Sequence, residues 1–171
     1  MDERDIAWAS AAGSFKYRTA AVIRNGDRML VCAVEHIDGW FLPGGKVQFG
    51  EDSAIALARE LREELELEVT IARRPLLITE GIRDEGGVIH QEVCFYYSAR
   101  WPEGVSPDAV DRLSGHRFSW IRPAALPDLR FLPPEIAELL IEPTTDVRHL
   151  AFDRRAPAWP IDDIIGGCSL P

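Results

Sequence analysis

The sequence predicts an α+β fold in which a mixed β-sheet carries helices on its faces. Strand-like runs follow one another as hairpins instead of alternating with helices, which argues against a doubly wound parallel sheet. Only two segments carry the spacing of an amphipathic helix. The 171 residues, 46% of them hydrophobic, are enough for one domain with a buried core.

The first predicted hairpin follows an N-terminal arm, residues 1–14, which is expected to be loose. Residues 15–24 (FKYRTAAVIR) and 28–35 (RMLVCAVE) are rich in apolar and β-branched side chains, as strands are. Between them, Asn25-Gly26 is a tight-turn signal, because both residues accept the positive φ of a two-residue hairpin turn. We therefore expect these two strands to pair.

A glycine turn precedes the first predicted helix. Residues 40–42 (WFL) form a short apolar strand that stops at Pro43-Gly44-Gly45. A helix is then expected over residues 51–65, where apolar residues recur every three or four positions. A sharp turn between a strand and a helix is a place where backbone groups can face a ligand.

The second half of the chain predicts another hairpin, a closing strand and a second helix. The predicted strands are residues 68–71, 76–83, 88–101 and 118–121. Asp84-Glu85-Gly86-Gly87 is a hairpin-turn signal between the second and third of them, and a polar loop covers residues 102–116. The second helix is expected at residues 133–141, where prolines occupy the first turn. Residues 143–171 are expected to form an extended C-terminal tail.

The charge and the cysteines limit the classes of partner. A net charge of -9 argues against binding to DNA, RNA or anionic lipid, so no nucleic-acid polymer is expected. No apolar run is long enough to cross a membrane, and the acidic N-terminus lacks the order of a signal peptide. Cys32, Cys94 and Cys168 are far apart, with no C-x-x-C spacing. We expect a cytoplasmic, reduced setting.

Three carboxylates stand apart from the apolar stripe of the predicted helix. At roughly 100° per residue, Glu60, Glu63 and Glu64 share one sector of the helix, and their charges repel. The simpler interpretation is a solvated helix face. Clusters of oxygen ligands are also what hard divalent cations such as Mg²⁺ require. Gly44 and Gly45, at a fixed distance before the helix, favour the metal site because bare carbonyls there can face an ion.

These residues resemble a known family. From Gly45 onward, GKVQFGEDSAIALARELREELEL is similar to the Nudix box, G-x5-E-x7-R-E-U-x-E-E-x-G-U, where U is a bulky aliphatic residue. Every fixed position matches except the last glycine, where this chain has Glu66. Residues 40–45 and 118–121 resemble the strand before the box and the closing strand of such domains. The resemblance covers residues 15–142.

The resemblance implies a Nudix-type α/β/α sandwich with a mixed sheet between helices. It also implies metal-dependent hydrolysis of a nucleoside diphosphate linked to another group, X. The implied ligands of Mg²⁺ or Mn²⁺ are three box carboxylates, one backbone carbonyl and one carboxylate outside the box: Glu60, Glu63, Glu64, Gly44 and Glu92. An exposed strand charge is an equal alternative for Glu92.

Catalytic roles follow from the same resemblance. Arg59 would orient the carboxylates, Glu51 would anchor the loop to the helix, and Glu63 or Glu64 would take the proton of the attacking water. Glu66 is expected to cost on the order of 1 kcal/mol at the helix end, or to let the helix run on, without loss of a metal ligand.

Substrate recognition is less defined by the sequence. Lys46, Arg18 and Arg83 are candidates to meet phosphates, and a plain surface charge is the alternative for each. His116 is a further acid–base candidate in the long loop. The acidic chain favours a small nucleotide over long RNA. The group X and the base are left open, and a homodimer is expected through the apolar tail segment at residues 161–165.

Three other functions remain as alternatives. A non-catalytic Nudix domain would only bind a nucleotide, although the complete carboxylate set argues against this. A Nudix-fold isomerase of isoprenoid diphosphates would need a reactive cysteine, and both Cys32 and Cys94 lie in apolar strand-like runs. An acidic interaction module would require the glycine spacing to be accidental.

Overall fold

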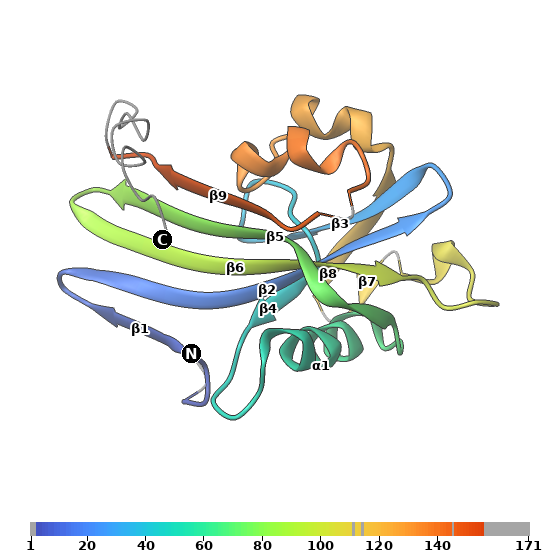
Figure 1. Ribbon diagram of the computed structural model, residues 1–171, viewed down its shortest axis with the longest axis horizontal. Coiled ribbons are helices and arrows are strands. Elements are labelled where there is room, and N and C mark those ends of the chain that lie inside the picture. Colours follow the sequence, from blue (N-terminus) through green and yellow to red (C-terminus); the bar gives the residue numbers. More distant parts are fainter. Residues whose placement is uncertain (1–2, 111, 114, 145, 156–171) are drawn as a thin grey trace, which may run out of the picture.

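The computed structural model describes residues 3–110, 112–113, 115–144 and 146–155 (Figure 1). Its main feature is a nine-stranded sheet with the order β7-β8-β3-β2-β6-β5-β9, to which β1 and β4 add by pairing with β2. The strands are β1 (Ala7–Ser10), β2 (Gly13–Asn25), β3 (Arg28–Val34), β4 (Gly44–Lys46), β5 (Thr70–Glu85), β6 (Val88–Arg100), β7 (Arg112–Leu113), β8 (His116–Ile121) and β9 (Arg148–Asp153).

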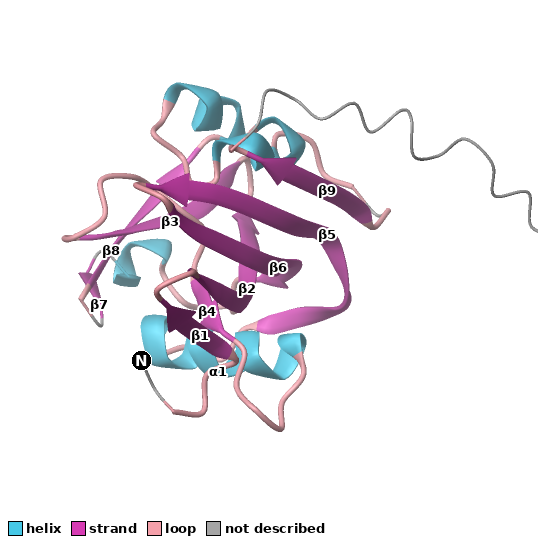
Figure 2. Cartoon of the chain, turned by 90° about the vertical axis from the view of Figure 1, so that its left-hand side faces the viewer, coloured by secondary structure: helices cyan, strands magenta, loops and turns pink. Residues whose placement is uncertain are grey.

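The sheet is mixed, as predicted. The pairs β2–β6 and β5–β9 are parallel, and the other paired strands are antiparallel. Figure 2 shows β9, β5, β6 and β2 following one another across this sheet. Hairpins β2–β3 and β5–β6 lie where the turn signals predict them. The α+β class is therefore confirmed.

Helices cover both faces of the sheet (Figure 1). On one face lies α1 (Ser53–Leu65), whose Leu57, Leu61 and Leu65 are buried against the sheet. The other face carries the short 3-10 helices η2 (Pro123–Asp128), η3 (Pro134–Ile136) and η4 (Glu138–Leu140), which bury Leu126 and Ile136 in a second core cluster. A further 3-10 helix, η1 (Pro107–Val110), precedes β7. None of the described helices is long and apolar enough to span a bilayer.

The prediction of an α-helix over residues 133–141 is wrong, because the segment forms 3-10 helices. The segment forms the two 3-10 turns η3 and η4, closed by bonds such as that from Leu140 N to Ala137 O, at 3.2 Å. Eight residues between the prolines at 133–134 and Pro143 leave too few backbone bonds to establish an α-helix, so the tighter turn is used.

The expected loose arm is also corrected. Its residues include β1, which pairs with β2, and Ile6 N donates to Val47 O at 2.8 Å. The expected tail contributes β9, which pairs in parallel with β5. Residues 156–171, including the segment 161–165, lie outside the described part of the chain. Backbone pairing at a sheet edge needs no strong side-chain pattern, and the sequence therefore predicted neither strand.

The strands β2 and β3 diverge immediately after their turn. They pair only at Arg24–Met29 and Asn25–Arg28, and the segment before α1 fills the space that opens between them. Phe41 exchanges backbone hydrogen bonds with Cys32 of β3, at 2.8 and 2.9 Å, and Trp40 forms a second bridge with Phe131, so the predicted strand at 40–42 consists of isolated bridges. The next residues, in β4, pair with β2. The glycine turn is thus held inside the sheet.

Both ends of α1 have defined caps. Asp52 precedes the first helical residue, and its Oδ1 accepts hydrogen bonds from Ala54 N and Ile55 N, both at 2.9 Å. The helix therefore begins at Ser53, two residues later than predicted. At the other end, Glu66 adopts φ 56° and ψ 27°, and its N–H bonds to the helix. A side chain in this left-handed conformation carries the expected strain.

We expect Glu66→Gly to raise the free energy of unfolding by about 1 kcal/mol, because glycine adopts the left-handed region without steric cost. Urea unfolding of the wild-type protein and the variant, in the absence of metal, measures the change. Glu66→Ala is the matched control, since it removes the carboxylate but keeps a Cβ. Equal stability of the glycine and alanine variants would contradict the assigned strain.

Candidate active site

The backbone of Gly44 faces α1 rather than β2. Ala21 N donates to Pro43 O and Val47 N donates to Tyr17 O, so these residues form the hydrogen-bonded pairs of the β2–β4 ladder. Hydrogen-bonded and open pairs alternate in an antiparallel ladder, so Gly44 points its N–H and C=O to the other side. Its N–H donates to Glu64 Oε2 at 3.0 Å. The Gly44 carbonyl lies on the same edge.

Glu64 is the most buried of the three box carboxylates. One oxygen accepts from Gly44 N, and the other lies 3.3 Å from His116 Nε2. Burial raises the pKa of Glu64 to about 8; the negative charges of Glu60 and Glu63 add to this, while the Gly44 N–H and the Arg18 charge oppose it. A buried carboxylate in this surrounding would be stabilised by a cation.

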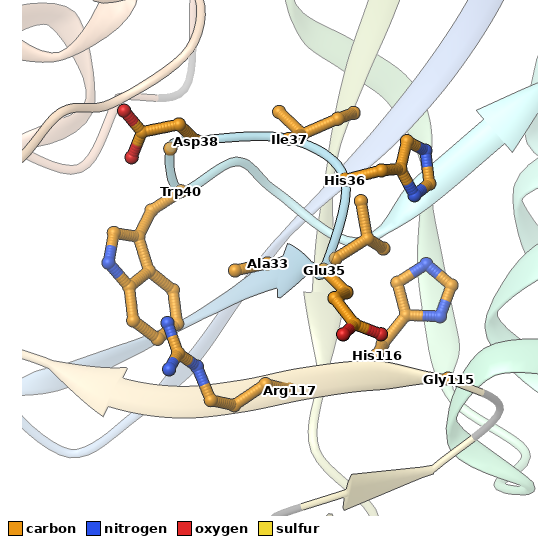
Figure 3. Close-up of a pocket in the computed structure, with 11 residues that line it drawn as sticks. Ala33, Glu35, His36, Ile37, Asp38, Trp40, Gly115, His116 and Arg117 are labelled. Carbon is orange, nitrogen blue, oxygen red and sulfur yellow. The ribbon is translucent and has the colours of Figure 1, made fainter.

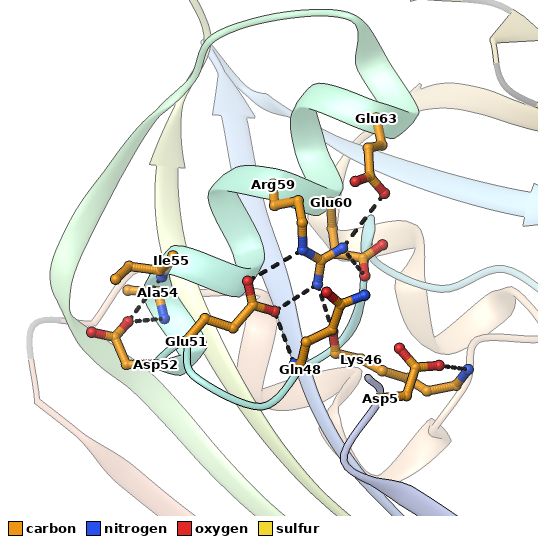
Figure 4. Close-up of polar contacts among 10 residues, drawn as sticks. All are labelled: Asp5, Lys46, Gln48, Glu51, Asp52, Ala54, Ile55, Arg59, Glu60 and Glu63. Carbon is orange, nitrogen blue, oxygen red and sulfur yellow. Dashed lines mark hydrogen bonds and ion pairs between the residues drawn. The ribbon is translucent and has the colours of Figure 1, made fainter. Parts of the chain in front are cut away.

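Gly45 leaves the space in which the Glu60 carboxylate lies. A Cβ built on Gly45 would overlap all three atoms of that carboxyl group. Arg59 Nη1 approaches Glu60 Oε1 at 2.8 Å and Glu63 Oε2 at 3.5 Å (Figure 4). The side chain of Glu63 is 60% exposed, so it is the most solvent-accessible of the three. The three carboxylates therefore lie between the glycine turn and one arginine.

Arg59 connects the helix to the loop before it (Figure 4). Its Nε and Nη2 bond both oxygens of Glu51, at 3.2 and 2.7 Å, and Nη2 also donates to Lys46 O at 3.0 Å. Glu51 in turn accepts from Gln48 N at 2.9 Å. The hydrogen bond from Arg59 lowers the pKa of Glu51. This network fixes the loop that carries the glycines relative to the helix that carries the carboxylates.

The donor set fits a hard divalent cation in its chemistry. No three His, Cys, Asp or Glu side chains among the described residues are gathered as a ready metal cluster. However, Glu60 and Glu64 supply carboxylate oxygens beside the backbone of the Gly44-Gly45 turn, and Arg59 already places a positive charge against Glu60. Oxygen-only ligands with space for water suit Mg²⁺ or Mn²⁺.

The other predicted site residues lie on β2, β4, β5 and β6. Glu92 lies 3.7 Å from Arg18, and Arg18 is close enough to Glu64 to affect its pKa. Lys46 does not point to open solvent; its Nζ contacts the buried Asp5 at 2.7 Å. The fold therefore brings Arg18 and Glu92 toward the carboxylates and ties Lys46 to the N-terminal segment.

Arg83 and Lys16 complete this part of the sheet. Arg83 pairs with Glu85 at 2.6 Å, in the β5–β6 hairpin. Lys16 was not predicted as a site residue. Its pKa is lowered by burial and by the neighbouring charges of Arg18, Arg83 and Lys46. The signal that could have identified Lys16 is period two: it precedes Arg18 by two residues, on the same face of β2.

Comparison with known proteins identifies a family and similar folds. The family model described as "NUDIX domain" matches residues 15–142. A Mycobacterium tuberculosis protein named "Putative 8-oxo-dGTP diphosphatase 2" is 36% identical over 97 residues, 56% of this chain. The match spans 62% of that relative's length.

Solved structures share the fold. A MutT protein from Bacillus halodurans has a TM-score of 0.63 at 18% identity, covering 81% of this chain and 89% of that one. The MutT NUDIX hydrolase from Burkholderia pseudomallei has a TM-score of 0.57 at 25% identity, covering 75% and 98%.

Proposed function

This chain belongs to the Nudix hydrolase family, and on that premise we propose that it is a metal-dependent pyrophosphohydrolase acting on a small nucleotide. The observation that carries the proposal is the arrangement of Glu60 and Glu64 against the Gly44-Gly45 turn. A diphosphate carries several negative charges, and this donor set is suited to hold the cations that neutralise them.

We assign separate roles to the residues of the site. Glu60, Glu63, Glu64 and the Gly44 carbonyl would hold Mg²⁺ or Mn²⁺, with Glu92 as a further carboxylate. When bound, such an ion polarises the phosphoryl group and lowers the pKa of water. Arg59 and Glu51 hold the carboxylates of the helix and the glycine turn in fixed positions relative to each other. One of Glu63 and Glu64 accepts the proton of the attacking water.

The cations of the sheet provide the place for the phosphate chain. Lys16, Arg18 and Arg83 lie on one face of β2 and β5. Burial lowers the pKa of Lys16, and the charges of Arg18, Arg83 and Lys46 lower it further against the opposing charge of Glu92. An anionic substrate would relieve this repulsion. In a chain with a net charge of -9, these cations are the groups that would meet a polyphosphate, which would compete with the carboxylate partners of Arg18, Arg83 and Lys46.

For the substrate, we place nucleoside triphosphates first. The support is the Mycobacterium tuberculosis relative, whose name specifies an oxidised guanine nucleotide. Cleavage would then release a nucleoside monophosphate and pyrophosphate. We place the reaction in the cytoplasm, where Cys32 and Cys94, both buried and unpaired, would stay reduced.

The test is hydrolysis of a panel of nucleoside triphosphates, 8-oxo-dGTP, nucleotide sugars and dinucleoside polyphosphates, with Mg²⁺, with Mn²⁺ and with a chelator. We expect metal-dependent turnover, with a nucleoside monophosphate among the products identified by chromatography. Binding of nucleotides without turnover of any compound would instead support a non-catalytic domain. Turnover that persists in excess chelator would contradict the assigned metal chemistry.

A further inference from the structure

An open cleft of about 810 Å³ adjoins the carboxylate site (Figure 3). It lies between the loop after β3, at residues 35–40, and the start of β8, at residues 115–117. Its volume is in the range of small-molecule sites. His116 lines the cleft and lies 3.3 Å from Glu64, so the cleft meets the box carboxylates at one end. A ligand in the cleft would therefore reach them.

One wall of the cleft is an aromatic ring with a guanidinium stacked on it. The backbone of Trp40 is held by hydrogen bonds from its N–H to Arg130 O and from Leu132 N to its carbonyl, both at 2.8 Å. The guanidinium of Arg117 stacks over the Trp40 ring, 4.7 Å from its centroid. Ala33 is paired with Arg117 in the β3–β8 register and has only a methyl side chain, which leaves the floor open. A planar ring in the cleft can stack on this Arg117–Trp40 pair.

The opposite side of the cleft carries the exposed side chain of Glu35. Figure 3 shows Glu35 next to His116, across the cleft from Trp40. No hydrogen bond or ion pair joins the Glu35 carboxylate to another residue in the part of the chain that the structure describes. Asp38, in the same loop, is instead paired with Arg130 at 2.6 Å. Glu35 is therefore the acceptor in the cleft that remains for a ligand.

We propose that this cleft binds the base of the substrate and that Glu35 selects bases of the guanine type. Guanine carries two adjacent N–H donors, N1–H and the exocyclic amine, which match the two oxygens of a carboxylate. Adenine presents an acceptor nitrogen at the corresponding position and would repel the carboxylate. Oxidation of guanine at C8 leaves both donors in place. This inference rests on the proposed function for its substrate class. It adds the side chain, Glu35, that recognises the base.

The first experiment measures binding without chemistry. GMP, IMP and AMP are titrated by calorimetry, in excess chelator, into the wild-type protein, Glu35→Gln and the control Glu103→Gln, whose carboxylate is exposed outside the cleft. We expect GMP to bind about 10-fold more tightly than AMP, with IMP between them because it has only one of the two donors. Glu35→Gln should bring GMP to within about 2-fold of AMP, and Glu103→Gln should keep the wild-type ranking. Equal binding of GMP and AMP by the wild type, or a ranking unchanged in Glu35→Gln, would overturn the inference.

A second variant tests the stacking wall separately. Arg117→Ala should weaken GMP and AMP by the same factor, about 5-fold, and leave their ratio unchanged. A change in neither affinity would overturn the placement of the base. The hydrolysis assay on the same variants distinguishes failure of the base-subsite proposal from failure of the proposed hydrolase function. Metal-dependent turnover with a base ranking that ignores Glu35 would reject only the base subsite. Glu35-dependent binding of GMP without turnover would reject only the hydrolase function.

Discussion

Glu64→Gln is expected to lower kcat by about 1,000-fold or more, which corresponds to about 4 kcal/mol of lost transition-state stabilisation. The amide keeps the size of the side chain but removes the negative charge. In the structure this carboxylate accepts the Gly44 N–H and lies against the glycine turn, so it is the box residue most enclosed by the metal site that we propose. Steady-state rates at saturating substrate and Mg²⁺ measure the loss.

The same variant should fold normally. Because burial already raises the pKa of Glu64 to about 8, a neutral amide costs the metal-free fold little. We expect urea unfolding in chelator to show a stability equal to or above that of the wild type. Glu68→Gln is the control: its carboxylate pairs with Arg62 on the exposed surface and should leave kcat unchanged. A Glu64→Gln variant that retains wild-type turnover would show that the reaction does not depend on the box.

Much of the fold follows from local sequence signals. The Asn25-Gly26 turn, the Gly86-Gly87 turn and the apolar stripe of α1 are all encoded within a few residues, and each lies where the pattern predicts. Pairing between distant segments is encoded only weakly. The strands β1 and β9 attach to sheet edges by backbone bonds, and no side-chain period marks them. The 3-10 turns after β8 depend on how their apolar residues pack on the sheet.

The same distinction between local sequence signals and long-range contacts applies to the candidate site. The spacing within one helix places Glu60 and Glu64 together, and the glycine turn precedes them at a set distance. Lys46 contacts Asp5, 41 positions away, because the N-terminal segment lies beside the residues after β4, and the sequence did not predict this arrangement. Glu35 and Trp40 face Arg117 only because β3 pairs with β8. Such contacts are visible only once the sheet order is known.

The two glycines of the turn should separate activity from stability. Gly45 does not have a positive φ, and the three atoms nearest to a Cβ there all belong to the end of a flexible side chain, the Glu60 carboxylate. We therefore expect Gly45→Ala to fold with a stability within about 1 kcal/mol of the wild type. The displaced carboxylate should lower kcat about 100-fold, as a misplacement of roughly 1 Å does.

In contrast to Gly45→Ala, Gly44→Ala should lower the stability of the fold. Its φ is +140°, and a Cβ there would overlap Thr19 O and lie 2.7 Å from Ala20 Cα, both in the backbone of β2. A backbone clash cannot be relieved by a rotamer change, so we expect the free energy of unfolding to fall by about 2–4 kcal/mol. Urea unfolding and steady-state kinetics on both variants decide the matter. If Gly45→Ala lost stability while keeping full turnover, the space beside Gly45 would serve the fold, and Glu60 would have no place in the reaction.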